Sequence, residues 1–241
     1  MRSRFFWPLL LILLAVSLAL VLWTGSPENA RYTDMACTFE NRVPACIDSV
    51  AAWRDGLAYY DSSVSATSDT LGALKSLLWD YWDIEFAGAG ASAVAADAIL
   101  PLRILEKRKS GCMGLVWLAM MVSEARGLPL NAVLLPGHVY LQYAPVGKPP
   151  VNLEPNRRGY TYTDAEYREK YRDGKWTGLE FRPLTPAQFT GLAAFDMGNL
   201  YLESEPPRAL RWYRLAGDLF PEYPGIKVNR DIAKSRLPDS P

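Results

Sequence analysis

A short apolar segment in the middle of the chain constrains the fold most. Residues 113–122 (MGLVWLAMMV) contain no polar side chain, so a helix formed here would be apolar on every face. A helix of this kind is buried in a core, and ten residues are too few to cross a bilayer, which takes about 20. Gly127 and Pro129 follow as helix terminators. The sequence therefore predicts a globular domain built around one central helix.

The composition agrees with a globular domain and excludes several classes of function. Of the 241 residues, 49% are apolar and 22% are charged, which allows a sizeable core. Basic and acidic side chains balance at 26 each, and a nucleic-acid partner is not expected because such proteins carry a basic patch. One histidine and three cysteines are too few for a His-rich or Cys₄ metal site. We expect neither a metal nor an organic cofactor.

An uncharged segment near the N-terminus predicts a membrane anchor. Residues 5–23 carry no charge over 19 residues, about the length that crosses a bilayer core. The bulky end of this segment, Leu20–Trp23, differs from a signal-peptide cleavage site. An uncleaved single-pass helix is therefore expected, and a cleaved signal is the alternative. Arg2 and Arg4 precede the segment and place the N-terminus in the cytoplasm and the main domain outside it, at the cell (inner) membrane and on its periplasmic side.

Two of the three cysteines are candidates for a disulfide. Cys37 and Cys46 bracket an eight-residue loop, and an oxidising compartment would allow them to pair. Closing a loop of about ten residues would stabilise the fold by roughly 2.7 kcal/mol in the chain-entropy model. Two unpaired small side chains are the alternative, which spacing alone does not exclude. Pairing would leave Cys112 as the free thiol.

Cys112 is predicted to begin the buried helix. The free backbone N–H groups and the positive dipole end of a helix N-terminus favour the thiolate, which is the nucleophilic form of cysteine. A buried structural cysteine is the alternative. Ser110 and Gly111 directly precede it, and we consider both as candidates for orienting support or for binding an oxyanion.

Two strands downstream bring the single histidine of the chain towards an acid. Apolar and polar residues alternate in His138–Tyr143 and again in 151–154. If the hairpin folds about residue 146, His138 lies opposite Glu154. A carboxylate on one imidazole nitrogen leaves the other free to act as a base. A slip of two residues would bring Asn152 or Asn156 there instead, and a half-buried structural histidine is a further alternative.

Three short motifs resemble the transglutaminase-like superfamily, above all its bacterial branch. The family shows a GC-x-G turn, a GLP helix end and a PGH strand in this order. The matching stretches here are Lys109–Leu115 (KSGCMGL), Arg126–Leu130 (RGLPL) and Leu135–Tyr140 (LPGHVY). The resemblance is strong over about residues 100 to 160, and it implies an α+β fold of the papain and transglutaminase type.

The resemblance also implies roles for individual residues. Cys112 matches the nucleophile and His138 the base, and Glu154 stands where the family acid is usually aspartate. The extra methylene of glutamate could weaken the orientation of His138, with Asn152 as a second orienting candidate. The implied chemistry is acyl transfer through Cys112, with backbone N–H groups near Cys112 holding the oxyanion. The outcome would be amide hydrolysis, deamidation or transamidation.

We expect three parts in the chain. Residues 1–30 would form the anchor and a tether, residues 31–183 the transglutaminase-like domain, and residues 184–241 a helical tail. Within the domain, residues 61–70 are rich in serine and threonine and are expected to connect two helices.

The tail shows a second resemblance. Small and aromatic residues between 191 and 221 resemble one tetratricopeptide-type helix pair, and two ordinary amphipathic helices are the alternative. A single pair of this type cannot bury its own face. The tail is therefore expected to pack on the domain or on a partner protein.

Two functions of different classes remain. The first is a membrane-anchored cysteine acyl-transfer enzyme that acts on a peptide or protein outside the cytoplasm. The second is a catalytically inactive transglutaminase-like interaction module whose tail docks a partner. The complete set of Cys112, His138 and Glu154 favours the enzyme, whereas the glutamate and the tail favour the module. A thiol redox protein is not expected because no C-x-x-C motif is present.

Overall fold

The computed structural model describes residues 30–43, 45–88 and 90–237, and from Arg31 onward these belong to one compact unit. The boundary expected between residues 183 and 184 therefore does not separate two compact units. The predicted anchor, residues 5–23, lies outside the described residues. Among the helices that are described, none combines the length and the apolar character needed to span a membrane.

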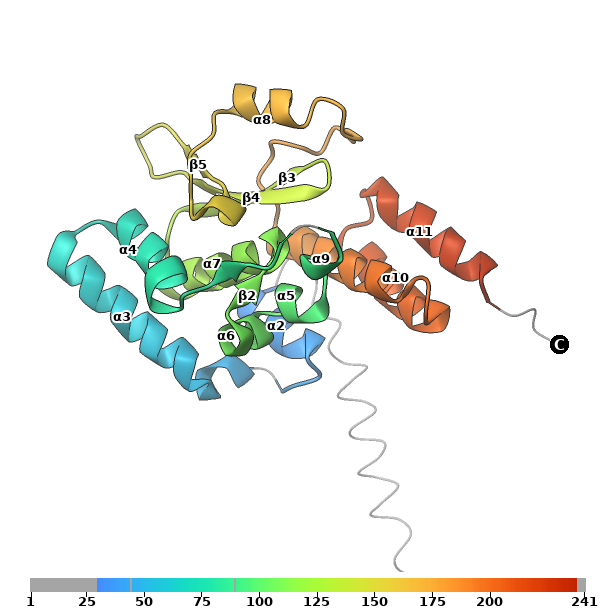
Figure 1. The fold of residues 1–241 in the computed structure, drawn as a ribbon, viewed down its shortest axis with the longest axis horizontal. Coiled ribbons are helices and arrows are strands. Elements are labelled where there is room, and N and C mark those ends of the chain that lie inside the picture. Colours follow the sequence, from blue (N-terminus) through green and yellow to red (C-terminus); the bar gives the residue numbers. More distant parts are fainter. Residues whose placement is uncertain (1–29, 44, 89, 238–241) are drawn as a thin grey trace, which may run out of the picture. The chain divides into compact units, whose positions relative to one another are not determined.

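The unit has an α+β architecture in which helices pack around a three-stranded sheet and a short parallel pair of strands, β1 and β2 (Figure 1). Before the central helix the chain forms α2 (Tyr32–Phe39), η2 (Cys46–Ser49), α3 (Ala51–Thr67), α4 (Thr70–Ser76), η3 (Leu77–Tyr81), β1 (Glu85–Phe86), η4 (Gly90–Ser92), α5 (Ala96–Ile99), α6 (Pro101–Lys107) and β2 (Lys109–Ser110). After it come β3 (Leu130–Leu135), β4 (His138–Tyr143), β5 (Val151–Leu153), η5 (Pro155–Arg157), α8 (Asp164–Lys170), α9 (Pro186–Tyr201), α10 (Pro206–Leu219) and α11 (Pro224–Ser235).

The predicted central helix is α7 (Cys112–Arg126). Its residues from Met113 to Ser123 are buried, as the all-apolar sequence requires. Gly127, in the left-handed conformation with φ of 66°, ends the helix. The indole Nε1 of Trp117, in the middle of α7, donates to the carbonyl of Tyr32 over 3.0 Å. This bond fastens α2 against the core.

The three-stranded sheet is antiparallel, in the order β3-β4-β5, and lies between α7 and α8 (Figure 1). Alternation, which was predicted for β4, divides the side chains of both β3 and β4 between two clusters. Ala132, Leu134, Val139 and Leu141 belong to the main core around α7. Val133, Leu135 and Tyr140 pack with Tyr167 of α8. The sheet is therefore covered on both faces.

The register between β4 and β5 differs from the predicted one by two residues. Gln142 pairs with Asn152 and Tyr143 with Val151, so His138 and Glu154 are not directly opposite each other. The turn is centred on Gly147 rather than on residue 146. Gly147 has a φ of 75°, a conformation that glycine adopts without the steric cost of a Cβ atom.

Helix α3 continues through residues that were expected to form a connection. Residues 61–67 make its last turns. The hydroxyls of Ser63, Ser65 and Thr67 donate to the carbonyls four residues earlier, which satisfies them inside the helix. The prediction of a connection over 61–70 was therefore wrong for most of its length.

Cys37 and Cys46 form a disulfide that joins α2 to η2, with their Cα atoms 5.7 Å apart. This spacing lies in the ordinary range for a disulfide. Cys112 is left as the free cysteine.

The tail folds as α9, α10 and α11, and α9 packs on the central helix. The rings of Phe189 and Trp117 are 5.9 Å apart, and those of Phe189 and Tyr32 are 5.6 Å apart. Between α9 and α10, Gly198 lies directly against the ring of Tyr213. The tail thus belongs to the core of the unit, while its resemblance to a tetratricopeptide pair stays a prediction.

Candidate active site

Cys112 is the first residue of α7, and two glycines allow the chain to reach it. A Cβ atom on Gly111 would overlap the carbonyl oxygen of Ala93, and one on Gly114 would overlap the carbonyl oxygen of Ala98. Both positions therefore require the absence of a side chain. This is the physical reason for the two glycines of the GC-x-G motif around Cys112.

His138 is the first residue of β4. It pairs with Leu135 across a two-residue turn made by Pro136 and Gly137, and Gly137 has a φ of 66°. The side chain is 7% exposed, and its ring stacks on Tyr171 with the ring centres 5.5 Å apart. The turn and the stacking fix the direction of the imidazole ring.

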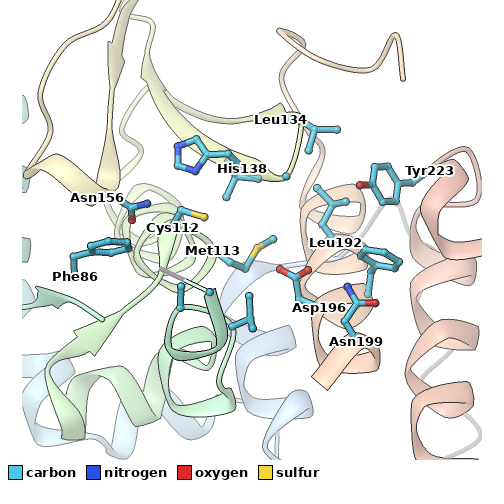
Figure 2. Close-up of a pocket in the computed structure, with 16 residues that line it drawn as sticks. Phe86, Cys112, Met113, Leu134, His138, Asn156, Leu192, Asp196, Asn199 and Tyr223 are labelled. Carbon is cyan, nitrogen blue, oxygen red and sulfur yellow. The ribbon is translucent and has the colours of Figure 1, made fainter. Parts of the chain in front are cut away.

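Figure 2 shows the side chains of Cys112 and His138 together at one end of a pocket, and their interaction is one of the causes that raise the pKa of His138. Because Nε2 of His138 is bonded to Glu154, Nδ1 is the nitrogen left for Cys112. Burial alone would lower the pKa of His138, but its hydrogen bonds with Cys112 and Glu154 and the charges of both groups raise that pKa to about 9. The ring therefore holds its proton at neutral pH.

Glu154 is 1% exposed. The hydrogen bonds of its carboxylate either hold the imidazole of His138 or fix the carboxylate itself. Its Oε2 lies 3.0 Å from Nε2 of His138 and accepts from the hydroxyl of Tyr167 over 3.2 Å. Its Oε1 accepts from the backbone N–H of Asn156. Burial acts to raise the pKa of Glu154, but the bond and charge of His138, the N–H of Asn156 and the charge of Lys170 together lower it. Glu154 is thus held as a carboxylate.

The length of glutamate suits this geometry. With the observed register, Glu154 follows the end of β5 and is a diagonal neighbour of His138. Diagonal neighbours have Cα atoms about 7–8 Å apart, farther than directly opposed residues. The extra methylene spans this longer distance. The concern that glutamate would orient His138 less well than aspartate therefore does not apply to this register.

Comparison with protein-family models gives a match over residues 40–191 to the transglutaminase-like superfamily (Transglut_core2), which is more than half of the chain. The chain belongs to the transglutaminase-like superfamily. Comparisons with curated proteins and with solved structures give no match. The matched range contains the three site residues and reaches into α9.

The other predicted supporting residues have structural bonds of their own. Asn152 accepts from Gln142 and donates to the carbonyl of Tyr162 and to Asp164, so it ties β5 to the start of α8 rather than contacting His138. The Ser110 hydroxyl lies 2.8 Å from the carbonyl oxygen of its neighbour Gly111. The structure therefore gives Asn152 and Ser110 no direct part in orienting the imidazole.

Gly111 was a candidate for binding an oxyanion, but its backbone N–H already has a partner. Its N–H donates to the carbonyl of Ala98 over 3.1 Å and is not free for an oxyanion. No side chain caps α7, and the first N–H groups of a helix have no partner inside it. The N–H of Cys112 itself is therefore the better candidate in this superfamily member.

Sequence reasoning missed two tyrosines that hold the site, one within α8 and one directly after it. Tyr167 donates to Glu154, and burial raises its pKa, so that it stays a neutral donor. Tyr171 stacks on His138. The two are four residues apart, and the start of the helix is marked by the Thr163 capping box. This spacing puts both rings on one helix face, which is the signal that could have found them.

A pocket of about 420 Å³ leads to Cys112 and His138 (Figure 2). Phe86 and the segment around Ala93 form one wall, and Asn156 lies beside Cys112. The opposite wall comes from α9 and from Tyr223, just before α11. The tail of this chain thus completes the pocket of the superfamily domain.

The described part of the chain contains no group of three or more histidine, cysteine, aspartate or glutamate side chains placed to hold a metal ion. The polar groups that line the pocket include a thiol, an imidazole held by a carboxylate, and the side-chain amide of Asn156, a set that suits nucleophilic chemistry at a cysteine.

Proposed function

We propose that this chain is a cysteine acyl-transfer enzyme. The observation that carries the proposal is the series of contacts from Cys112 to His138 to Glu154. Cys112 is the first residue of a helix, and both Cys112 and His138 line a pocket. A nucleophile, a base within hydrogen-bond reach and a third group that orients the base are the parts this chemistry needs. Membership of the superfamily supports the same reaction class.

The mechanism follows from the protonation states. The sulfur of Cys112, as thiolate, attacks an amide carbonyl carbon and forms a tetrahedral oxyanion. His138, which holds a proton through its interaction with Glu154, gives that proton to the leaving amine as the C–N bond breaks. A thioester on Cys112 remains. Water or an amine then attacks it while His138 takes a proton back, and the thiolate leaves.

Asn156 is the side chain we infer as a second oxyanion donor, together with the N–H of Cys112. It lines the pocket next to Cys112 (Figure 2). Its backbone is fixed by the bond to Glu154. Its side-chain Nδ2, which is the donor an oxyanion needs, takes part in no hydrogen bond among the described residues, and its buried Oδ1 is also unpaired. An amide left unpaired at a reacting centre is available to a substrate.

Replacing Asn156 with alanine is expected to lower kcat by roughly 10²-fold and to change KM little, because an oxyanion donor acts mainly in the transition state. Hydrolysis of p-nitrophenyl acetate, a generic acyl donor, measures both constants. The matched control is Asn131→Ala, since Asn131 is half-buried on β3 and outside the pocket. A rise in KM with kcat unchanged would contradict the oxyanion role and assign Asn156 to substrate binding.

The substrate we propose is a peptide or protein amide outside the cytoplasm, close to the membrane. A disulfide between Cys37 and Cys46 suits an oxidising compartment, and residues 5–23 have the length and composition of an anchor. With water as the acceptor the enzyme is a peptidase or deamidase, and with an amine it forms cross-links.

Alkylation of Cys112 tests the proposal without a known substrate. Iodoacetamide reacts with thiolates, and a free cysteine with a pKa of about 8.5 is almost entirely a thiol at pH 6. Because Cys112 is the free cysteine of the chain, the label reports on one site. At pH 6 we expect the full-length protein to react at least about tenfold faster than His138→Ala, since the imidazolium stabilises the thiolate.

A Cys112→Ser variant controls for labelling at any other residue. Slow reaction with the pH profile of an ordinary thiol, unchanged by His138→Ala, would reject the enzyme. That result would favour the second candidate, an inactive interaction module whose helical tail docks a partner protein. A specific observation in favour of that candidate is the row of exposed apolar side chains Val228, Ile232 and Leu237 on and just after α11.

A further inference from the structure

We propose that Asp196 and Tyr223 form a subsite beside Cys112 that binds a primary ammonium group of the substrate. This inference rests on the proposed acyl-transfer function and names a feature of its substrate. It begins from the far wall of the pocket, which α9 supplies through Leu192, Phe195 and Asp196. Figure 2 shows the Asp196 carboxylate turned towards Met113, the residue after Cys112.

Among the described residues that line the pocket, Asp196 is the only carboxylate, and there is no lysine or arginine. No hydrogen bond or ion pair joins Asp196 to another described side chain. Three other carboxylates of this unit are compensated. Glu154 binds His138, Glu124 accepts from the start of α2, and Glu180 accepts from Thr177 and Gly178. Asp196 therefore presents an uncompensated acceptor to whatever enters the pocket.

The surroundings of Asp196 are apolar and aromatic. Phe195 and Tyr223 pack edge to face, with ring centres 5.4 Å apart. Asp196 is half-buried, and burial raises its pKa to about 7, because contact of its charge with water is reduced and no described side chain pairs with it. A bound cation would restore that stabilisation. The other charged side chain that lines the pocket, His138, is already paired with Glu154, so the pocket can accept a further positive charge next to Asp196.

A primary ammonium fits this wall better than other groups. It has three donors and no acceptor, and the Asp196 carboxylate and the Tyr223 hydroxyl are acceptors lining one wall. The aromatic rings add a favourable cation–π surface. Asn199, one turn along α9, does not compete as an acceptor, because its Oδ1 already accepts from Tyr213 and Asn229.

The pH dependence of this subsite can be assigned to Asp196. The titratable groups that face it are Tyr213 of α10 and Tyr223, and across the pocket Cys112 and His138. Burial raises the pKa of Tyr213 to about 12 and also that of Tyr223, so neither ring ionises between pH 6 and 8. Cys112 and Glu154 together raise the pKa of His138, and Cys112→Ala removes part of that effect. The comparison with Asp196→Asn in the same background therefore separates the titration of Asp196 from that of His138.

The test measures binding and not turnover. Full-length Cys112→Ala is titrated with n-butylammonium and with n-butanol, an uncharged probe of the same length, by calorimetry. At pH 8 we expect n-butylammonium to bind at least fivefold more tightly than n-butanol, and at least threefold more tightly than at pH 6. Adding Asp196→Asn should remove both differences. Adding Asp218→Asn, the same charge change at an exposed residue of α10, should keep them.

Equal binding of the two probes, or a preference for the cation that survives Asp196→Asn, would overturn the subsite. The preference for n-butylammonium over n-butanol at pH 8 is measured in Cys112→Ala alone. This part of the test therefore holds even if the Asp196→Asn variant does not fold. The two proposals can also fail separately. An inert Cys112 with intact binding of n-butylammonium would reject acyl transfer alone, whereas a reactive Cys112 without that binding would reject the subsite alone.

Discussion

Replacing Glu154 with glutamine is expected to lower the rate of acyl transfer by about 10²–10⁴-fold, the scale on which the analogous change acts in a Ser-His-Asp triad. The buried carboxylate accepts from Nε2 of His138 and stabilises the imidazolium. Glutamine keeps the volume but removes the charge, and its NH₂ group can oppose the ring N–H. The measurement is kcat/KM for p-nitrophenyl acetate, compared with that of the unmodified chain.

The dependence of kcat/KM on pH tests the role of Glu154 by a second, independent measurement. The pKa of His138 is raised from 6.5 to about 9 by Cys112 and Glu154. His138 therefore keeps the proton it must donate until the pH rises through about 9, where kcat/KM should fall. Without the charge of Glu154 this alkaline limb is expected to move to lower pH. An unchanged rate and an unchanged limb in Glu154→Gln would remove Glu154 from the site.

Replacing Glu154 with aspartate separates the effect of the negative charge from the effect of side-chain length. Glu154→Asp keeps the carboxylate but shortens it by one methylene, which leaves the diagonal distance to His138 incompletely spanned. We expect a loss of about 10–10²-fold, smaller than for glutamine, because a misplacement of about 1 Å carries a cost of that order. Glu169→Gln, at an exposed position of α8, is the control for a change of surface charge. Full activity of Glu154→Asp would contradict the diagonal geometry.

This diagonal geometry marks the limit of what the sequence could predict about the sheet. Alternation identified β4 and β5, because side chains in a covered strand must alternate between its two faces. The register was missed because it depends on which residue of the 144–150 loop adopts positive φ, and Gly147 does. A loop with three prolines and one glycine offers several turn positions of similar cost, and only packing selects among them.

The sequence could predict the parts of the candidate site that depend on short-range signals, such as turns and helix starts. An apolar helix preceded by a small-residue turn places Cys112, and a Pro-Gly turn places His138. The opposite wall was not predictable in this way, since Asp196 and Tyr223 reach the pocket only because α9 packs on α7 through Phe189. Such contacts between distant segments leave no periodic signal in either segment. The tail was expected to pack on the domain or on a partner protein, but its part in the pocket was not foreseen.

The second large effect is expected from Gly114→Ala, which should lower the free energy of unfolding by about 2–3 kcal/mol through overpacking. A Cβ atom here would overlap the carbonyl oxygen of Ala98 and lie 2.8 Å from Oγ of Ser110. The same carbonyl accepts from the N–H of Gly111, the N-cap residue directly before α7. The substitution would therefore also displace Cys112. Urea unfolding measures the first effect and alkylation of Cys112 by iodoacetamide the second.

Gly217→Ala is the matched control, because Gly217 is also inside a helix but a Cβ atom there would meet its nearest neighbour at an ordinary 3.7 Å. It is expected to stabilise the chain by about 0.5–1 kcal/mol, the usual gain from alanine in a helix. Gly114→Ala with unchanged stability would mean that α5 can move away from α7 at little cost. Loss of stability with Cys112 still reactive would mean instead that the start of α7 is held by bonds other than the one from Gly111 to Ala98. Only loss of both ties the second glycine of the motif to the position of the nucleophile.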